Sequence, residues 1–111
     1  MLPFILKGQT NPKGCYCTRD TVFRLGSCWT FKNNSLFEYR SWDRHGEFIG
    51  KGIYKILNNT LTVKFKGLEY EYPAFGITNG AIWKIPIKII DSVEIIIRRN
   101  KYEVVLKKET E

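Results

Sequence analysis

Three cysteines, Cys15, Cys17 and Cys28, are the residues of this chain best suited to covalent or metal-ligand chemistry. In an extended segment Cys15 and Cys17 project from the same face, and the Cys-x-Cys spacing is poor for a disulfide between them. Cys28 lies one run later and could pair with either of them, and we expect Cys17–Cys28 ahead of Cys15–Cys28. Three cysteines are too few for a closed zinc site, and His45, the only histidine, is distant in the sequence. We therefore expect one disulfide, one free thiol, and no metal or other cofactor.

Residues that could carry out general acid–base or nucleophilic catalysis are sparse. His45 and Asp43 are the only histidine–carboxylate pair close in sequence, and both fall in a run of turn residues. A general base needs a partner held in a fixed position, which a solvated turn does not supply. No histidine lies near Cys15 or Cys17 in the sequence to activate a thiol. We expect no catalytic residues, and therefore no enzyme.

The segment from Trp29 to Phe65 has the pattern of a continuous antiparallel β-meander. Runs rich in aromatic and β-branched residues are separated by turn residues at Asn33-Asn34, Asp43–Gly46 and Asn58-Asn59. The run after the last turn alternates cleanly and places three apolar side chains on one face: Leu61, Val63 and Phe65.

Two glycines, Gly50 and Gly52, occupy alternate positions of the run that precedes the Asn58-Asn59 turn. Both share a face with Tyr54 and Ile56, so they leave a gap in the side chains of that face. A gap of this kind admits a large ring from a neighbouring strand or lets the strand bend. We expect the two glycines to serve packing rather than the approach of a ligand.

The C-terminal half continues the alternation with one interruption. We expect Leu68, Tyr70 and Tyr72 to face inward, and Pro73 to end that run because it cannot donate to a central ladder. Residues 73–80 then form a loop. Two hairpin arms and a closing strand follow, with Val93 and Tyr102 among their inward positions. The alternation predicts one core that includes these side chains: Leu61, Val63, Phe65, Trp83, Ile85, Ile87, Ile95 and Val104.

These runs predict an all-β fold, an antiparallel meander of about eight or nine strands forming a small up-and-down barrel or a two-layer sandwich. A length of 111 residues suits one domain with one core. We place that domain at residues 15–111, and we interpret residues 1–14 as a flexible N-terminal segment or the remnant of a signal peptide. No stretch approaches the ~18 apolar residues that a transmembrane segment needs.

Four short motifs mark successive runs of the segment 29–65: Trp29-Thr-Phe, Leu36-Phe-Glu-Tyr, Gly50-x-Gly-x-Tyr-x-Ile and Leu61-x-Val-x-Phe. Together they resemble the repeated-hairpin pattern of small bacterial lipocalin-like domains. The resemblance implies an exported, calyx-like β-fold that in some members binds a small apolar ligand. It implies no catalytic residues.

The chain is basic, with a formal net charge of +7 and a pI of 9.4. Its basic residues are dispersed, and the densest cluster is Arg98-Arg99-Asn100-Lys101. Dispersed charge favours a β-domain with Lys and Arg on outward strand positions over a dedicated basic face. The alternative is a nucleic-acid-binding β-barrel that combines basic and aromatic side chains on one surface: Tyr39, Arg40, Trp42, Arg44 and Lys55.

A non-catalytic binding or interaction module, for a protein partner or a small apolar ligand, is the function that these observations favour. Phe75 and Ile77 are candidate contact residues because recognition residues often lie on loops. Tyr39 and Trp42 are the other candidates, and their burial distinguishes a core from a nucleic-acid surface. One disulfide suits an exported protein, whereas three reduced thiols would suit a cytoplasmic one, and we expect export.

Overall fold

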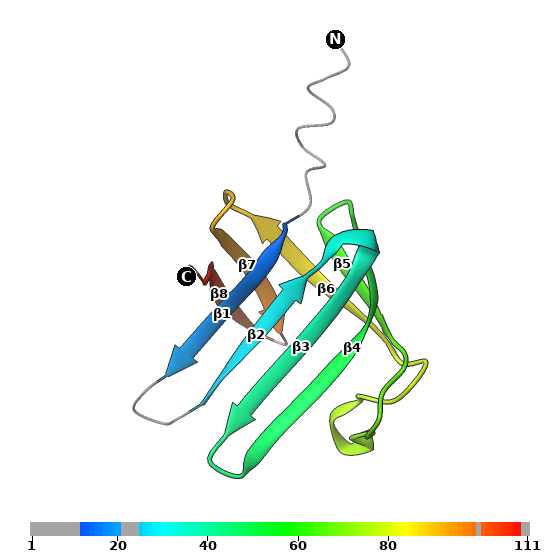
Figure 1. Cartoon of the computed structure of the whole chain (residues 1–111). Coiled ribbons are helices and arrows are strands. Elements are labelled where there is room, and N and C mark those ends of the chain that lie inside the picture. The colour runs from blue at the N-terminus through cyan, green and yellow to red at the C-terminus, as the bar shows by residue number, and fades with distance from the viewer. Residues whose placement is uncertain (1–11, 21–24, 100, 110–111) are drawn as a thin grey trace.

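The computed structural model describes residues 12–20, 25–99 and 101–109 of the chain. Their strands form one antiparallel sheet in which each strand pairs with the next and β8 pairs with β1, so the sheet closes into an eight-stranded barrel (Figure 1). The predicted all-β meander is confirmed, and it forms an up-and-down barrel rather than a two-layer sandwich. The strands are β1 (Gly14–Asp20), β2 (Leu25–Phe31), β3 (Leu36–Asp43), β4 (Gly46–Leu57), β5 (Thr60–Phe65), β6 (Ile82–Ile89), β7 (Glu94–Arg99) and β8 (Tyr102–Lys108).

Two single turns of 3-10 helix, η1 (Asn33–Ser35) and η2 (Pro73–Phe75), are the helical elements of the described residues. Most of the predicted N-terminal segment, residues 1–11, lies outside the described part of the chain, and β1 already begins at Gly14.

The core lies inside the barrel and receives side chains from all eight strands. Alternate side chains of a strand point to opposite faces, so closing the sheet directs one set inward. Six of the eight predicted core residues are buried, and the other two, Trp83 and Val104, are partly buried and pack against them. The buried cluster consists of Tyr16, Trp29, Phe31, Phe37, Tyr39, Tyr54, Leu61, Val63, Phe65, Ile77, Ile85, Ile87, Ile95, Ile97 and Leu106.

Three of the predicted inward positions are wrong, and all lie in connections or at a strand end. Residues 68–72 form no strand, because Gly67 (φ +73°) turns the chain out of the ladder after β5, and Tyr70 is 72% exposed. Val93 belongs to the turn before β7, where its N–H donates to Asp91 Oδ1 at 2.9 Å. Tyr102, the first residue of β8, is 73% exposed. Turn geometry sets side-chain direction at these positions, so alternation no longer predicts it.

Asparagine and aspartate form the hairpin turns that the sequence predicts. Asn58 and Asn59, with φ of 53° and 62°, make the two-residue turn between β4 and β5, and Asn tolerates this left-handed region better than most residues. The turn between β3 and β4 is closed by Asp43, whose Oδ1 accepts the backbone N–H of His45 at 2.7 Å. The one histidine–carboxylate pair close in sequence therefore makes a turn contact.

The connection between β5 and β6, residues 66–81, lies at one end of the barrel (Figure 1) and is tied to it by backbone hydrogen bonds. Ile77 is 2% exposed and belongs to the core cluster. The indole N–H of Trp83 donates to the Gly76 carbonyl at 3.2 Å, and the backbone N–H of Gly80 donates to the Phe65 carbonyl at 2.6 Å. These contacts make the connection part of the packed domain.

Candidate functional site

The four predicted binding residues do not form one site. Ile77 and Tyr39 are buried, and their side chains are core residues. Phe75 is 57% exposed, and its ring lies 4.5 Å from the ring of Phe48, centroid to centroid. Of these residues only Phe75, together with the half-buried Trp42, presents surface to a partner.

Trp42 lies on the outer face of β3, directly opposite Gly26 of β2. A Cβ added at Gly26 would lie 2.5 Å from Trp42 Cζ2, so the indole covers the bare backbone of that glycine. Covering of a strand glycine by a cross-strand ring is a packing role. Nearby Arg40 is engaged by Glu47, with Nε 2.7 Å from Oε2. Of the aromatic and basic surface predicted around Tyr39 and Trp42, the outer face of β3 carries Arg40 and Trp42, whereas the Tyr39 ring is buried in the core.

Ring side chains occupy the centre of the barrel. Ring centroids lie 4.6 Å apart for Trp29 and Tyr39, and 4.9 Å apart for Phe65 and Trp83. Within the described part of the chain the buried indole N–H of Trp29 has no hydrogen-bond partner, and aromatic rings surround it. Packed rings leave little room for an apolar ligand in the part of the interior that these residues line.

The outer face of β4, β5 and β6 carries the largest unbalanced charge of the described surface. Six exposed lysines lie on these strands or directly after them, and we call them the lysine face: Lys51, Lys55, Lys64, Lys66, Lys84 and Lys88. None of the six forms an ion pair within the described residues. The sequence contains no Asp or Glu from 48 to 68 or from 72 to 90, so no carboxylate lies between these lysines on β4, β5 and β6. At the edge of the face, Glu38 of β3 lies opposite Lys51.

Cross-strand register gathers these lysines into rows. Lys55 of β4 and Lys84 of β6 both lie opposite Thr62 of β5. In the next row, Lys64 lies between Ile53 and Ile82. Residues opposite or diagonal across neighbouring strands lie roughly 5–8 Å apart, close enough for like charges to repel. The face therefore combines mutually repelling ammonium groups with exposed aliphatic side chains.

On the outer faces of β7 and β8, residues of opposite charge face one another across the two strands. Arg98 of β7 lies opposite Glu103 of β8, and Glu94 lies opposite Lys107. Elsewhere Lys32 Nζ lies 2.9 Å from Glu38 Oε2. The excess of positive charge on the described surface is thus concentrated on one side of the barrel.

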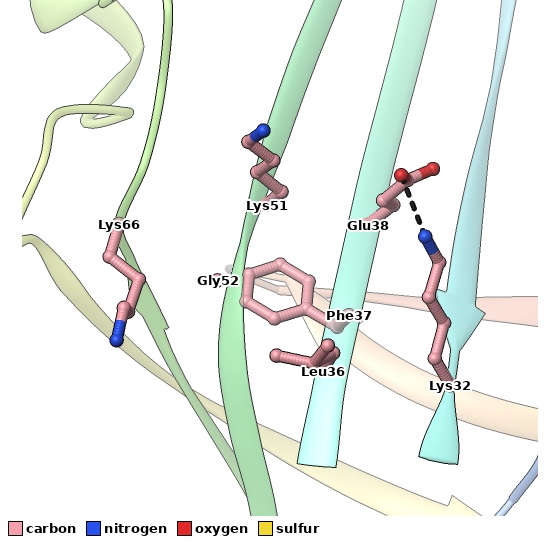
Figure 2. Close-up of a pocket in the computed structure, with 7 residues that line it drawn as sticks. All are labelled: Lys32, Leu36, Phe37, Glu38, Lys51, Gly52 and Lys66. Carbon is pink, nitrogen blue, oxygen red and sulfur yellow. Dashed lines mark hydrogen bonds and ion pairs between the residues drawn. The ribbon is translucent and has the colours of Figure 1, made fainter. Parts of the chain in front are cut away.

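A hollow of about 170 Å³ lies at the edge of the lysine face, where β3, β4 and the end of β5 meet. Figure 2 shows the Lys32 ammonium directed at Glu38, while Lys51 and Lys66 extend away from that pair. Leu36, 44% exposed, supplies apolar wall. The wall of the hollow also holds Glu38, which pairs with Lys32 and lies opposite Lys51 in the register of β3 and β4, so the local excess of positive charge there comes from Lys51 and Lys66.

Runs of consecutive like charges do not reveal the lysine face, because its lysines are separated along the sequence. Lysines at alternate positions of a strand share one face, and adjacent strands place several such positions side by side. A sequence signal was available in the long stretches without Asp or Glu, 48–68 and 72–90. On neighbouring strands that lack Asp and Glu, the positive charge of the lysines is not balanced by carboxylates.

Cys17 and Cys28, the pair expected ahead of Cys15–Cys28, are joined by a disulfide, and Cys15 is a free thiol. Comparison of the chain with known protein families, curated proteins and solved structures gave no match.

Among the described residues there is no helix with the length and apolar character needed to cross a membrane.

Proposed function

We propose that this barrel is a non-catalytic interaction module that docks an acidic protein partner against the lysine face. The observation that carries the proposal is the set of six exposed lysines with no carboxylate among them. Gathering like charges on one face costs stability, and an oppositely charged partner relieves that repulsion. A complementary surface also raises the rate of association through electrostatic steering.

The composition of the lysine face favours a protein over nucleic acid. Proteins that bind single-stranded nucleic acid stack bases on exposed aromatic rings, and Arg adds planar contacts. The outward positions of β4, β5 and β6 hold no aromatic side chain and no Arg. They hold aliphatic side chains instead, with Ile53, Leu57 and Ile82 between 38% and 56% exposed. An apolar centre within a polar rim is the usual anatomy of a protein–protein interface.

Membership of the small bacterial lipocalin-like domains belongs to the same proposal. The up-and-down barrel and the positions of the hairpins at Asn33-Asn34 and Asn58-Asn59 support it. The ring-filled centre favours a member that binds at its outer surface over one that holds an apolar ligand in a calyx. The Cys17–Cys28 disulfide supports an exported location, because disulfides persist in oxidising compartments.

The proposal is tested with two triple charge reversals of equal net charge. The first variant, Lys55→Glu/Lys64→Glu/Lys84→Glu, reverses the centre of the lysine face. The matched control reverses three exposed lysines elsewhere: Lys13, Lys101 and Lys107. Binding of a fluorescent poly-L-glutamate peptide is followed by anisotropy for both variants and the wild type, with circular dichroism to verify the fold.

We expect the first variant to lose affinity for the peptide by at least about tenfold relative to the control, because only it removes the local complementarity. Equal losses in both variants would mean that the peptide responds to net charge alone, and would contradict the proposal. A single-stranded oligonucleotide of the same charge that binds at least as tightly as the peptide would favour the nucleic-acid alternative instead.

A further inference from the structure

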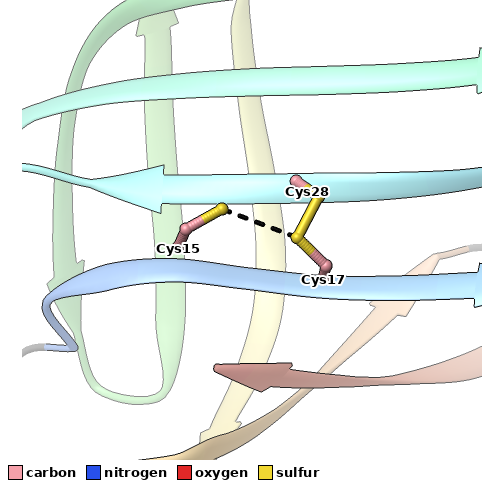
Figure 3. A group of neighbouring side chains, drawn as sticks. All are labelled: Cys15, Cys17 and Cys28. Atoms are coloured by element: carbon pink, nitrogen blue, oxygen red, sulfur yellow. Dashed lines mark hydrogen bonds between the residues drawn. A yellow bond between two sulfur atoms is a disulfide. The ribbon is translucent and has the colours of Figure 1, made fainter. Parts of the chain in front are cut away.

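Three sulfur atoms gather on the outside of the barrel, on the wall formed by β1 and β2 (Figure 3). The Cys15 thiol lies 3.5 Å from Cys17 Sγ, and Cys17 is bonded to Cys28. All three Sγ atoms lie within 4.8 Å of one another. The free thiol therefore lies in direct contact with the disulfide.

Strand geometry sets this arrangement. Cys15 and Cys17 are two residues apart on β1 and so share its outward face, while the Tyr16 ring between them is buried in the core. Cys28 lies directly opposite Cys17 in the register of β1 and β2. The register therefore supplies a third sulfur to a Cys-x-Cys pair whose own sulfurs already face the same way.

The backbone that carries the sulfurs is held independently of the disulfide. Seven residue pairs join β1 to β2, from Gly14↔Phe31 to Asp20↔Leu25. Beneath the cysteines, Tyr16 and Trp29 are each 1% exposed and anchor the two strands in the core. Opening the disulfide therefore leaves three cysteine side chains on a fixed frame, with their sulfurs still close together.

The cluster opens to the outside at Cys15, which is partly exposed, whereas Cys17 and Cys28 are 6% and 8% exposed beneath it. Charged groups surround this opening. A hollow of about 500 Å³ is lined by all three cysteines, and Glu38 and Glu109 contribute to its wall. In the cross-strand row, Lys107 lies opposite Cys17 and Arg40 lies opposite Cys28. Basic side chains favour thiolates, and the carboxylates favour the approach of a cation.

We propose that the reduced form of this cluster is a binding site for a soft, thiophilic monovalent cation, Cu(I), held by the thiolates of Cys15, Cys17 and Cys28. A dithiol reductant transfers two electrons to the Cys17–Cys28 bond and is itself converted to a disulfide, which leaves three thiols on β1 and β2. Cu(I) then displaces three protons and forms three copper–sulfur bonds without a change in its oxidation state. In the oxidised form only one of the three sulfurs is a thiol, so the site is closed.

The number of ligands selects the ion. Thiolate ligands select Cu(I), Zn(II) and iron–sulfur clusters among biological metals. Structural zinc takes four ligands, whereas Cu(I) is satisfied by three thiolates in a plane. Metal–sulfur bonds of about 2.3 Å in a trigonal complex place the sulfurs roughly 4 Å apart. Cys15 Sγ already lies 3.5 Å from Cys17 Sγ and within 4.8 Å of Cys28 Sγ, and the Cys17 and Cys28 sulfurs move apart once their bond is opened. Three sulfurs on one face therefore suit Cu(I) better than zinc.

The test is an anaerobic competition titration of the full chain with Cu(I), using a chromophoric Cu(I) chelator as competitor. The protein is first reduced with dithiothreitol, and the reductant is removed. We expect the reduced wild type to take one Cu(I) per chain and the oxidised protein to take none. Cys15→Ser, which leaves Cys17 and Cys28 in place, should weaken binding by at least about tenfold because one of three thiolate ligands is lost.

Two results would overturn the proposal. Equal Cu(I) affinity of reduced wild type and Cys15→Ser would mean that Cys15 is not a ligand. Loss of the near-ultraviolet circular dichroism of the reduced wild type would mean that the barrel does not hold the three sulfurs together without the disulfide. Lys55→Gln, on the outer face of β4 and away from the sulfurs, serves as the control that removes a lysine charge and should leave Cu(I) binding unchanged.

Discussion

The ring of Phe65 on β5 lies where a side chain at Gly50 on β4 would project. A Cβ added at Gly50 would lie 2.5 Å from Phe65 Cε1, and one added at Gly52 would lie 2.0 Å from the backbone oxygen of Lys64. The first glycine makes room for a ring and the second for a neighbouring backbone. Both glycines therefore serve packing, as expected. The ring of Phe65 is the neighbour of Gly50, whereas the neighbour of Gly52 is the backbone of β5.

Substituting these glycines should therefore have unequal effects. Gly50→Ala should lower the free energy of unfolding by about 1–3 kcal/mol, because the buried Phe65 ring must move. Gly52→Ala should cost more, because a backbone carbonyl in the ladder cannot move aside. Urea unfolding of both variants measures the difference, with the exposed Lys55→Ala on the same strand expected to change stability by less than about 0.5 kcal/mol. A Gly52→Ala variant as stable as the wild type would contradict this description of the β4–β5 contact.

The loop residues Ile77 and Phe75 should respond very differently to truncation. Ile77→Ala should destabilise the protein by about 2–5 kcal/mol, because it empties a site in the core. Phe75→Ala removes a ring that is 57% exposed and rests on Phe48, and should cost much less. Thermal melts of the two variants compare the effects. Equal and small shifts would mean that the connection 66–81 is not part of the core.

Stability should fall at alkaline pH because of a buried tyrosine. Burial raises the pKa of the Tyr54 hydroxyl above its ordinary value of 10.0, since the phenolate is poorly solvated inside the barrel. The folded state then holds this proton more tightly than the unfolded state does. The stability that the neutral Tyr54 hydroxyl contributes is therefore fully present below pH 10.0 and is lost as the pH rises above that value. Tyr54→Phe should flatten the decline in unfolding free energy above pH 10.0. An identical decline in wild type and variant would assign the effect to other groups.

The Cys17–Cys28 disulfide should stabilise the folded barrel. It closes a short loop, with a sequence separation of 11, for which the chain-entropy model gives about 2–3 kcal/mol. Cys28→Ala should lower the unfolding free energy by that amount, whereas Cys15→Ser should leave it nearly unchanged. Denaturant unfolding measures both, and intact-mass analysis after alkylation should find one reactive thiol in the wild type. Three reactive thiols in protein taken from its native compartment would contradict both the disulfide and the proposed export.

The strands and most of the core could be predicted from the sequence, because alternation is a local property of a pleated chain. Leu61, Val63 and Phe65 are buried as the alternation of their run indicates. Tyr70 and Val93 were misplaced because single turns, one at Gly67 and one at Asp91, redirect the chain. The choice between barrel and sandwich depends on the pairing of β1 with β8, a contact between distant segments that no local pattern encodes.

The candidate site could be predicted only in part, because its residues come together through register. Lys55, Lys64 and Lys84 lie on three strands, and their proximity follows from pairings across β4, β5 and β6. Loop position suggested Ile77 as a contact residue, but an apolar residue in a connection can equally fold back into the core, as it does here. Sequence alone does not distinguish these two outcomes.

Mapping where an acidic polypeptide binds tests the role of the lysine face. Backbone amide shifts of the ¹⁵N-labelled protein are recorded while unlabelled poly-L-glutamate is added at low salt. We predict saturable shifts centred on the lysine face, largest around Lys55, Lys64 and Lys84, and reduced by added salt as charge screening requires. Shifts centred instead on the outer faces of β7, β8 and β1, or spread evenly over the barrel, would contradict the proposal that the lysine face is the docking surface.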